Sequence, residues 1–181
     1  MSKLEIKTTD SRIVYQNKYG VTLREEVFER SDGYEGLYGF VEKADFALVV
    51  PFDGAHFWLV EQYRYPARRR SLEFPQGTFR EGDGDPLELA RCELREETGL
   101  VSGNMKHLGR FYGAPGLVAQ AFNVFLATDL RRDGDPKLEP EEAGLTQAKL
   151  SRAELEATMR VGAIIDAPSI TAYFLALQWL G

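Results

Sequence analysis

Hydrophobic and polar residues alternate in short segments near the start of the chain. These segments are separated by Gly, Asn and Asp, and they cover residues 11–15, 21–28 and 36–41. A period of two residues is typical of strands with one apolar face, and the intervening residues are typical of turns. We therefore expect a small antiparallel β-sheet as a subdomain over residues 1–43.

Longer apolar runs follow this first region. Residues 46–52 and 57–63 are strongly apolar, and Asp53-Gly54 lies between them. An Asp-Gly pair between two apolar runs is typical of a β-hairpin. We expect these runs to pair with each other in the main sheet of a second domain over residues 44–181.

A helix is predicted over residues 86–98. Pro86 suits the first helical position, Asp85 can cap the N-terminus, and Gly99 is a typical stop.

The rest of the pattern completes the fold class. Apolar segments predict strands over residues 106–112 and 122–128 and helices over residues 153–159 and 169–179. This order of strands, helix, strands and helices favours an α/β fold in which helices cover both faces of a mixed sheet, an α/β/α sandwich.

Composition and charge narrow the range of partners. The 181 residues are 44% hydrophobic and 28% charged, which suits one domain of ordinary size with a small appendage. The net charge of -6 repels nucleic acid polymers and anionic membranes, so we expect neither as a partner. A small anionic substrate is compatible with this charge if arginines or a bound metal ion receive it.

The compartment follows from cysteine usage and from the hydropathy pattern. Cys92 is the single cysteine, so no intrachain disulfide can form and the chain suits a reducing compartment. The first residues lack an apolar core of signal-peptide length, and no later stretch is apolar over a membrane span. We expect a cytoplasmic protein.

Three carboxylates share one face of the predicted helix. Glu93, Glu96 and Glu97 lie at positions i, i+3 and i+4. Like charges at this spacing destabilise a helix by roughly 0.2 to 0.5 kcal/mol per pair, so a cation is expected nearby. Such a group on an arbitrary helix is most often a solvated acidic face. The residues around it favour a functional site instead.

The helix follows a glycine-rich loop, Gly77-Thr-Phe-Arg-Glu-Gly-Asp-Gly, and ends Glu93-Leu-Arg-Glu-Glu-Thr-Gly-Leu. This order resembles the Nudix box, in which a glycine and a loop precede a helix bearing Arg-Glu, an aliphatic residue, any residue, Glu-Glu, any residue, Gly and an aliphatic residue. The second half matches over residues 93–100. The loop is one residue longer than the family pattern, with Asp83 near the acidic position, and Cys92 stands at the arginine position.

The resemblance implies a metal-dependent site. Glu93, Glu96 and Glu97 are implied as ligands of Mg²⁺, or of Mn²⁺ in its place, because hard oxygen ligands suit these ions. The backbone carbonyl of Gln76 is implied as a further ligand, and Gly77 would allow the turn that presents it.

The resemblance also implies a general base on an acidic loop. The loop holds Glu139, Glu141 and Glu142. Glu142, then Glu141, is the preferred candidate for taking a proton from water, and Glu97 is counted with them as catalytic. An acidic loop of this kind is otherwise a solvated surface.

Beyond the box, the chain resembles the ADP-ribose pyrophosphatase branch of the family. The segments that carry this resemblance are Glu61-Gln-Tyr-Arg-Tyr-Pro, Leu72-Glu-Phe-Pro-Gln-Gly and Phe122-Asn-Val-Phe-Leu-Ala. Arg64 is implied to bind the substrate diphosphate, for which a forked guanidinium suits the geometry. Glu73 is implied either to line the pocket or to order the loop.

Two further features bear on the substrate. Pro115 and Gly116 resemble the Pro-Gly loop of the branch and are implied to contact substrate, although Gln120 stands where glutamate is frequent. The run Arg68-Arg69-Arg70 could reach a phosphate, but such a run is more often a solvated turn.

The resemblance implies hydrolysis of a nucleoside diphosphate derivative, ADP-ribose or a nucleotide sugar, to a nucleoside monophosphate and a phosphorylated remainder. It also implies a homodimer in which the N-terminal subdomain takes part in dimerisation and in the substrate site. Two alternatives remain: a house-cleaning pyrophosphohydrolase of nucleoside triphosphates, and a weakly catalytic domain that binds nucleotide as a sensor.

Overall fold

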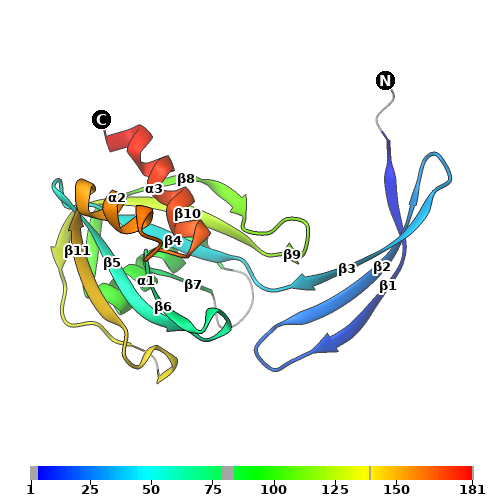
Figure 1. Ribbon diagram of the computed structural model, residues 1–181, viewed down its shortest axis with the longest axis horizontal. Coiled ribbons are helices and arrows are strands. Elements are labelled where there is room, and N and C mark those ends of the chain that lie inside the picture. The colour runs from blue at the N-terminus through cyan, green and yellow to red at the C-terminus, as the bar shows by residue number, and fades with distance from the viewer. Residues whose placement is uncertain (1–3, 79–83, 139, 181) are drawn as a thin grey trace. The chain divides into compact units, whose positions relative to one another are not determined.

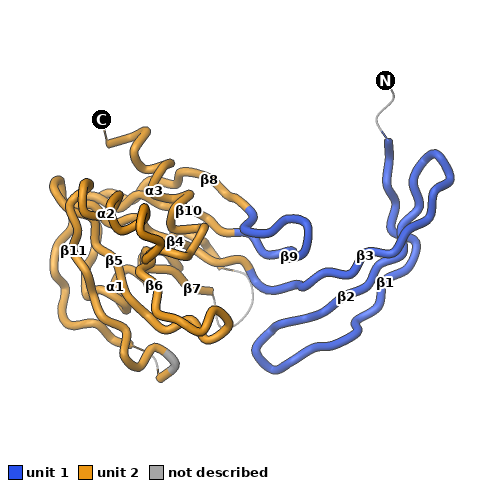
Figure 2. Tube along the Cα trace, viewed as in Figure 1, with its two compact units in different colours: residues 1–44, 112–121 blue, residues 45–111, 122–181 orange. Residues whose placement is uncertain are grey.

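The computed structural model describes residues 4–78, 84–138 and 140–180. The chain forms two compact units, drawn in different colours in Figure 2. Unit 1 consists of Met1–Ala44 and Tyr112–Ala121, and unit 2 consists of Asp45–Phe111 and Phe122–Gly181. None of the helices in the described residues is long and apolar enough to cross a membrane.

Unit 1 is built on a sheet with the strand order β1-β2-β3-β9. Its strands are β1 (Ile6–Gln16), β2 (Thr22–Arg30), β3 (Glu35–Glu42) and β9 (Val118–Ala119). The first three strands are antiparallel, as the alternating pattern predicted, and β9 adds a short parallel edge to β3.

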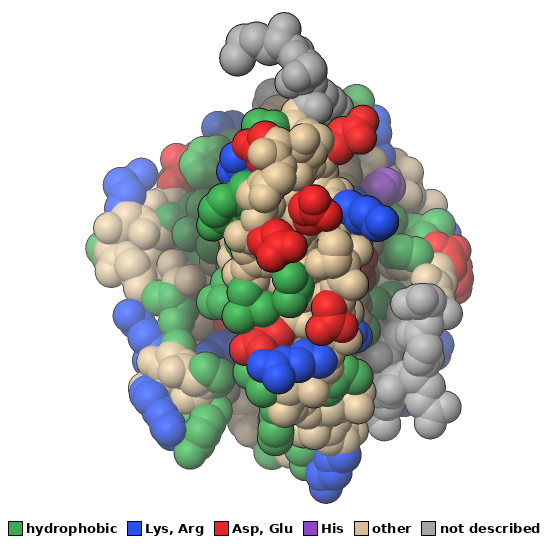
Figure 3. Space-filling view, turned by 90° about the vertical axis from the view of Figure 1, so that its right-hand side faces the viewer, with side chains coloured by type: hydrophobic (Ala, Val, Ile, Leu, Met, Phe, Trp, Pro, Cys, Tyr) green, Lys and Arg blue, Asp and Glu red, His purple; other side chains and the backbone are tan. Residues whose placement is uncertain are grey.

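The sheet of unit 1 leaves apolar side chains in contact with solvent. Every residue of β1 is exposed, and Ile6, Ile13 and Leu37 are 66%, 52% and 62% exposed. Figure 3 shows hydrophobic side chains among acidic ones on the face of the molecule that it presents. This sheet therefore buries little of its own apolar surface.

Unit 2 contains two sheets and all three α-helices of the described residues. Its strands are β4 (Phe46–Pro51), β5 (His56–Arg64), β6 (Arg69–Glu73), β7 (Gln76–Thr78), β8 (Leu100–Tyr112), β10 (Ala121–Arg132) and β11 (Thr146–Ser151). Its helices are α1 (Pro86–Thr98), α2 (Arg152–Arg160) and α3 (Ala167–Leu180), with short 3-10 turns η1 (Tyr65–Ala67) and η2 (Pro140–Glu142). One sheet has the order β7-β4-β10-β8 and the other has the order β11-β5-β6.

Alternate residues of β4 point into two different cores. Ala47 and Val49 pack with the apolar residues of α1, whereas Leu48 and Val50 pack with those of α2 and α3. Since successive side chains of a strand point to opposite faces, the sheet is covered by helices on both sides. The arrangement is visible in Figure 1. Parallel pairing of β4 with β10 and antiparallel pairing with β7 make the sheet mixed. The predicted α/β/α sandwich is confirmed.

The hairpin predicted from Asp53-Gly54 is wrong. β4 and β5 belong to different sheets, and only an isolated bridge joins Phe52 to Phe57. Asp53 does form a tight reversal, because its carboxylate accepts hydrogen bonds from the backbone N–H groups of Ala55 and His56. Both edges of β4 are already paired with β7 and β10, so the chain enters the second sheet after the turn.

Both ends of α1 follow the predicted signals. The Asp85 side chain accepts a hydrogen bond of 2.9 Å from the Leu87 N–H, and Gly99 ends the helix with a φ of 68°. Leu89, Ala90 and Leu94 are buried against the sheet. This packing fixes the direction in which the helix glutamates point.

Candidate active site

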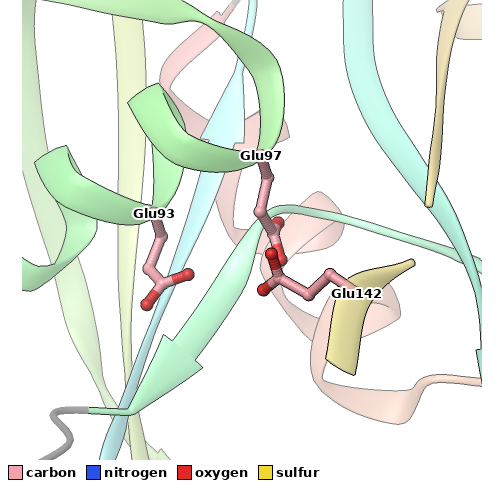
Figure 4. Close-up of side chains that lie close together, drawn as sticks. All are labelled: Glu93, Glu97 and Glu142. Atoms are coloured by element: carbon pink, nitrogen blue, oxygen red, sulfur yellow. The ribbon is translucent and has the colours of Figure 1, made fainter. Parts of the chain in front are cut away.

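Three carboxylates from two elements come together in unit 2. Glu93 and Glu97 project from successive turns of α1, and Glu142 ends the turn η2. One carboxylate oxygen of each lies within 4.8 Å of the others. Figure 4 shows Glu97 and Glu142 pointing toward one another, with Glu93 beside them. The structure therefore brings a loop that is distant in sequence to helix α1.

This acidic cluster is poorly solvated. Glu97 is 1% exposed and Glu93 is 9% exposed. Burial, followed by the charges of Glu93 and Glu142, raises the pKa of Glu97 well above its ordinary value. Three oxygen-bearing groups with mutual repulsion at a buried position suit a hard divalent cation such as Mg²⁺ or Mn²⁺. The residues fit the metal that the sequence implies.

Gly77 makes room for the cluster. A Cβ atom at this position would overlap the Glu93 carboxylate. Gly77 is not among the glycines with a positive φ, so a left-handed backbone is not the reason for glycine here. A side chain here would instead have to displace the Glu93 carboxylate, which approaches the backbone closely.

Gln76 connects the cluster to neighbouring polar groups. Its backbone N–H donates to a Glu97 carboxylate oxygen at 3.2 Å, which lowers the pKa of Glu97 and so opposes the effect of burial. Its side-chain amide donates to Glu73 at 3.0 Å and to Asp166 at 3.1 Å. Gln76 thus orients Glu97 through its backbone and is itself held through its side chain.

Arg64 and Glu73 form an ion pair next to the cluster. The Arg64 Nε donates to both Glu73 carboxylate oxygens, at 3.0 and 2.9 Å, and one terminal nitrogen makes a further contact. Glu73 is 1% exposed, whereas the Arg64 side chain is 40% exposed. The other terminal nitrogen, Nη1, makes no hydrogen bond within the described part of the chain. Arg64 also acts electrostatically on Glu97, so it brings positive charge to the site.

Glu96 is not one of the three clustered carboxylates. It is half-buried and contacts Cys92 on the side of α1 that carries Arg91 and Arg95, the outer side. There it lines a surface pocket of about 390 Å³ with Cys92, Arg91 and Arg95. Burial and the neighbouring Glu96 carboxylate raise the pKa of the exposed Cys92 thiol to about 11.

The neighbouring arginines have other partners on this outer side. Arg91 pairs with Glu88 at 3.6 Å, and Arg95 pairs with Asp133 at 2.8 Å. The spacing of the glutamates along the sequence does not separate these two sides of the helix.

Pro115 and Gly116 belong to unit 1. The Gly116 carbonyl accepts a hydrogen bond of 2.9 Å from the Tyr38 hydroxyl. Pro115 lines a pocket of about 320 Å³ whose walls include Tyr38, Phe40 and Tyr112.

Some sequence candidates fall outside the described residues. These are the side chain of Glu141 and the whole of Asp83 and Glu139.

Sequence reasoning missed Asp166 as a neighbour of the site. One oxygen of Asp166 accepts hydrogen bonds from the Ser169 N–H at 2.9 Å, the Ser169 hydroxyl at 2.7 Å and the Gln76 amide. The sequence Asp166-Ala-Pro168-Ser169 is a helix-start signal that could have identified it. What the sequence does not reveal is that the cap of α3 also holds Gln76.

Comparisons with known proteins show what the chain is similar to. Residues 42–168 match the NUDIX domain. The chain is 34% identical over 124 residues to an ADP-ribose pyrophosphatase of Mycobacterium tuberculosis, a match that covers 68% of this chain and 60% of that protein. It is 30% identical over 131 residues to an ADP-ribose pyrophosphatase of Bacillus subtilis, covering 72% of this chain and 70% of that protein.

A solved structure supports the fold over nearly the whole chain. The crystal structure of an ADP compounds hydrolase superposes with a TM-score of 0.84, covers 99% of this chain and 97% of its own, and is 23% identical. With the NUDIX match over residues 42–168 and the α/β/α sandwich around α1, the chain belongs to the Nudix family.

Proposed function

We propose that the chain is a Mg²⁺-dependent hydrolase that cleaves the diphosphate of a nucleoside diphosphate derivative. ADP-ribose or a nucleotide sugar is the substrate, and the products are a nucleoside monophosphate and a phosphorylated remainder. The observation that carries this proposal is the cluster of Glu93, Glu97 and Glu142, in which a buried carboxylate has a raised pKa. The names of the two pyrophosphatase relatives support the choice of substrate.

The metal ligands are Glu93 and Glu97, with Glu96 and the Gln76 carbonyl completing the set. When bound, Mg²⁺, or Mn²⁺ in its place, supplies positive charge that neutralises and polarises the diphosphate. The ligand carboxylates must be ionised to hold it, and the Gln76 N–H favours the ionised form of Glu97.

Glu142 is the general base, with Glu141 as the second candidate on the same turn. Glu142 accepts a proton from the water that attacks one phosphorus of the diphosphate. A bond forms between the water oxygen and that phosphorus, and the bond from the phosphorus to the bridging oxygen breaks. The bridging oxygen leaves with the other phosphate. Glu97 takes part in catalysis as a ligand that would hold the metal.

Arg64 binds the diphosphate through the part of its guanidinium that Glu73 does not occupy. The ion pair with buried Glu73 fixes the plane of the fork, so little side-chain freedom is lost when a phosphate binds. Pro115 and Gly116 are included as substrate contacts because of their resemblance to the Pro-Gly loop of the branch.

The proposal includes a homodimer in the cytoplasm. The exposed apolar residues of β1 and β3 support a second copy of the chain as the partner, because a sheet of this size is marginal without further burial. Light scattering should give twice the 20.4 kDa mass of one chain, and Ile13→Glu should reduce the dimer fraction. A wild-type monomer at all concentrations would rule out this part of the proposal.

The reaction is tested by product analysis. The protein is incubated with ADP-ribose, nucleotide sugars and nucleoside triphosphates, with and without Mg²⁺, and the products are separated by ion-exchange chromatography. AMP and ribose 5-phosphate from ADP-ribose, formed only with the metal, are the expected result. Pyrophosphate released from triphosphates alone would indicate a house-cleaning enzyme, and binding without turnover would indicate a sensor.

A further inference from the structure

The loop that carries Glu142 lies just beyond the end of a strand ladder. β11 pairs with β5 from Thr146, opposite Glu61, onward. Before Thr146 the loop is held by a turn in which the Leu145 N–H donates to the Glu142 carbonyl at 2.9 Å. Leu145 is 8% exposed, and Gly144 has a φ of 90°. The position of Glu142 is therefore set by this short turn and not by the strand ladder.

Arg70 reaches this segment from another strand. Its Nη2 donates to the Gly144 carbonyl and to the Glu61 carbonyl, each at 3.0 Å. Its Nε donates to the Glu61 carboxylate at 2.9 Å. One planar guanidinium thus joins β6, β5 and the loop, with a fixed angle between its donors.

The ion pair of Arg70 is too exposed to contribute much to stability. The side chains of Arg70 and Glu61 are 41% and 39% exposed, and ion pairs of this kind contribute little to folding. The bond from Arg70 to Gly144 instead restrains the position of the loop where the strand ladder has ended.

We infer that Arg70 is a positioning residue for Glu142, acting through the Gly144 carbonyl, which lies two residues from the general base. The inference rests on the proposed role of Glu142. Arg70 does not touch the reacting groups in this account. It lowers the freedom of the loop so that the Glu142 carboxylate stays beside Glu97.

Arg69 provides a matched control. It is the neighbouring residue, it is exposed, and its Nη2 donates at 3.0 Å to the carbonyl of Gly162, in the segment between α2 and α3. Arg69→Met and Arg70→Met both keep an apolar stem, and each removes a bond from a guanidinium to a loop carbonyl. The two variants release different loops, and Arg70→Met also removes the bonds to Glu61.

The kinetic test uses ADP-ribose with saturating Mg²⁺. Arg70→Met should lower kcat by about 10- to 100-fold, because small displacements of a catalytic group have effects of that size. KM should stay within about twofold, and Arg70→Lys should recover part of the rate. Arg69→Met should match the wild type. In the Glu142→Gln background, Arg70→Met should have almost no further effect, because both changes remove the same function.

A second readout does not depend on activity. Hydrogen exchange of the backbone amides in residues 142–146 should accelerate in Arg70→Met and not in Arg69→Met. Equal exchange and equal kcat in the two variants would overturn the inference, as would full additivity with Glu142→Gln. A wild-type protein that hydrolyses no diphosphate would overturn the proposed function, while faster exchange in Arg70→Met alone would still establish the restraint on the loop.

Discussion

The two sides of α1 carry similar residues in different surroundings. On the inner side, Glu93 and Glu97 are buried and lie with Glu142. On the outer side, Glu96 is half-buried next to the exposed thiol of Cys92. The three helix glutamates are within five residues of one another in sequence, so the difference comes from what packs against each side.

The local charge balance differs accordingly. Arg91, Arg95 and Lys137 line the outer pocket with Glu96, and solvent screens the charges there. On the inner side, Arg64 acts on Glu97 and is itself paired with Glu73. Burial and the charges of Glu93 and Glu142 disfavour the ionised form of Glu97 there, a condition that a metal ion relieves.

The strongest test of this difference is Glu97→Gln. The variant should lose about 1000-fold or more in kcat/KM, because it removes both a ligand and charge from the inner side, and even the outer-shell partners of ligands contribute about 10- to 100-fold. Steady-state hydrolysis of ADP-ribose measures the effect. Glu88→Gln, at an exposed position in the first turn of the same helix, is the control and should stay within about twofold of the wild type. Similar losses in both variants would show that the helix, rather than the inner side, is being perturbed.

Glu142→Gln should have the next largest effect. Loss of a general base should lower kcat about 100-fold, while the affinity for Mg²⁺ changes much less than in Glu97→Gln. The rise of kcat with pH that reports the ionisation of the base should disappear in the variant. A pH profile that keeps the wild-type shape would show that another group acts as the general base. Glu141 would then be the first residue to test.

Glu96→Gln sharpens the comparison because it changes the outer side alone. If Glu96 completes the metal set from its position beside Cys92, turnover at limiting Mg²⁺ should fall about 10-fold and recover as Mg²⁺ is raised. A loss of turnover as large as that of Glu97→Gln would show that Glu96 belongs to the same metal site as Glu93 and Glu97. No loss at any Mg²⁺ concentration would restrict the helix ligands to Glu93 and Glu97.

The smallest effect concerns stability in the absence of metal. The folded-state pKa of Glu97 lies above its ordinary value of 4.5. Its contribution to stability is therefore present below that value and is lost as pH rises through the folded-state pKa. Glu97→Gln should raise the metal-free melting temperature near pH 8 by about 2 to 4 °C, the shift expected for about 1 kcal/mol in a chain of this size. The difference should vanish at about pH 4. A lower melting temperature for the variant near pH 8 would show that the ionised Glu97 carboxylate does not destabilise the metal-free fold.

Much of the fold could be predicted from the sequence because its signals are local. The limits of α1 follow from Asp85, Pro86 and Gly99, whose effects act within a few residues. The pairing of β4 could not be predicted in this way. The Asp53 turn specifies a reversal of the chain, but which strands occupy the edges of β4 depends on residues far away in sequence.

The same limit applies to the candidate site. The helix spacing predicts that Glu93, Glu96 and Glu97 share one face, but it does not reveal which of them is buried. Burial is decided by the packing of Leu89, Ala90 and Leu94 against the sheet. The restraint that Arg70 imposes on the loop at Gly144 joins residues 74 positions apart, and the run of three arginines gives no sign of it.

The central claim is that the inner side of α1 forms a divalent cation site. Titration of the metal-free protein with Mn²⁺, followed by electron paramagnetic resonance, measures this directly. The wild type and Glu88→Gln should bind alike, and Glu97→Gln should bind at least about 10-fold more weakly. The affinity of the wild type should increase with pH as Glu97 loses its proton. Equal affinity in the wild type and Glu97→Gln would contradict the account.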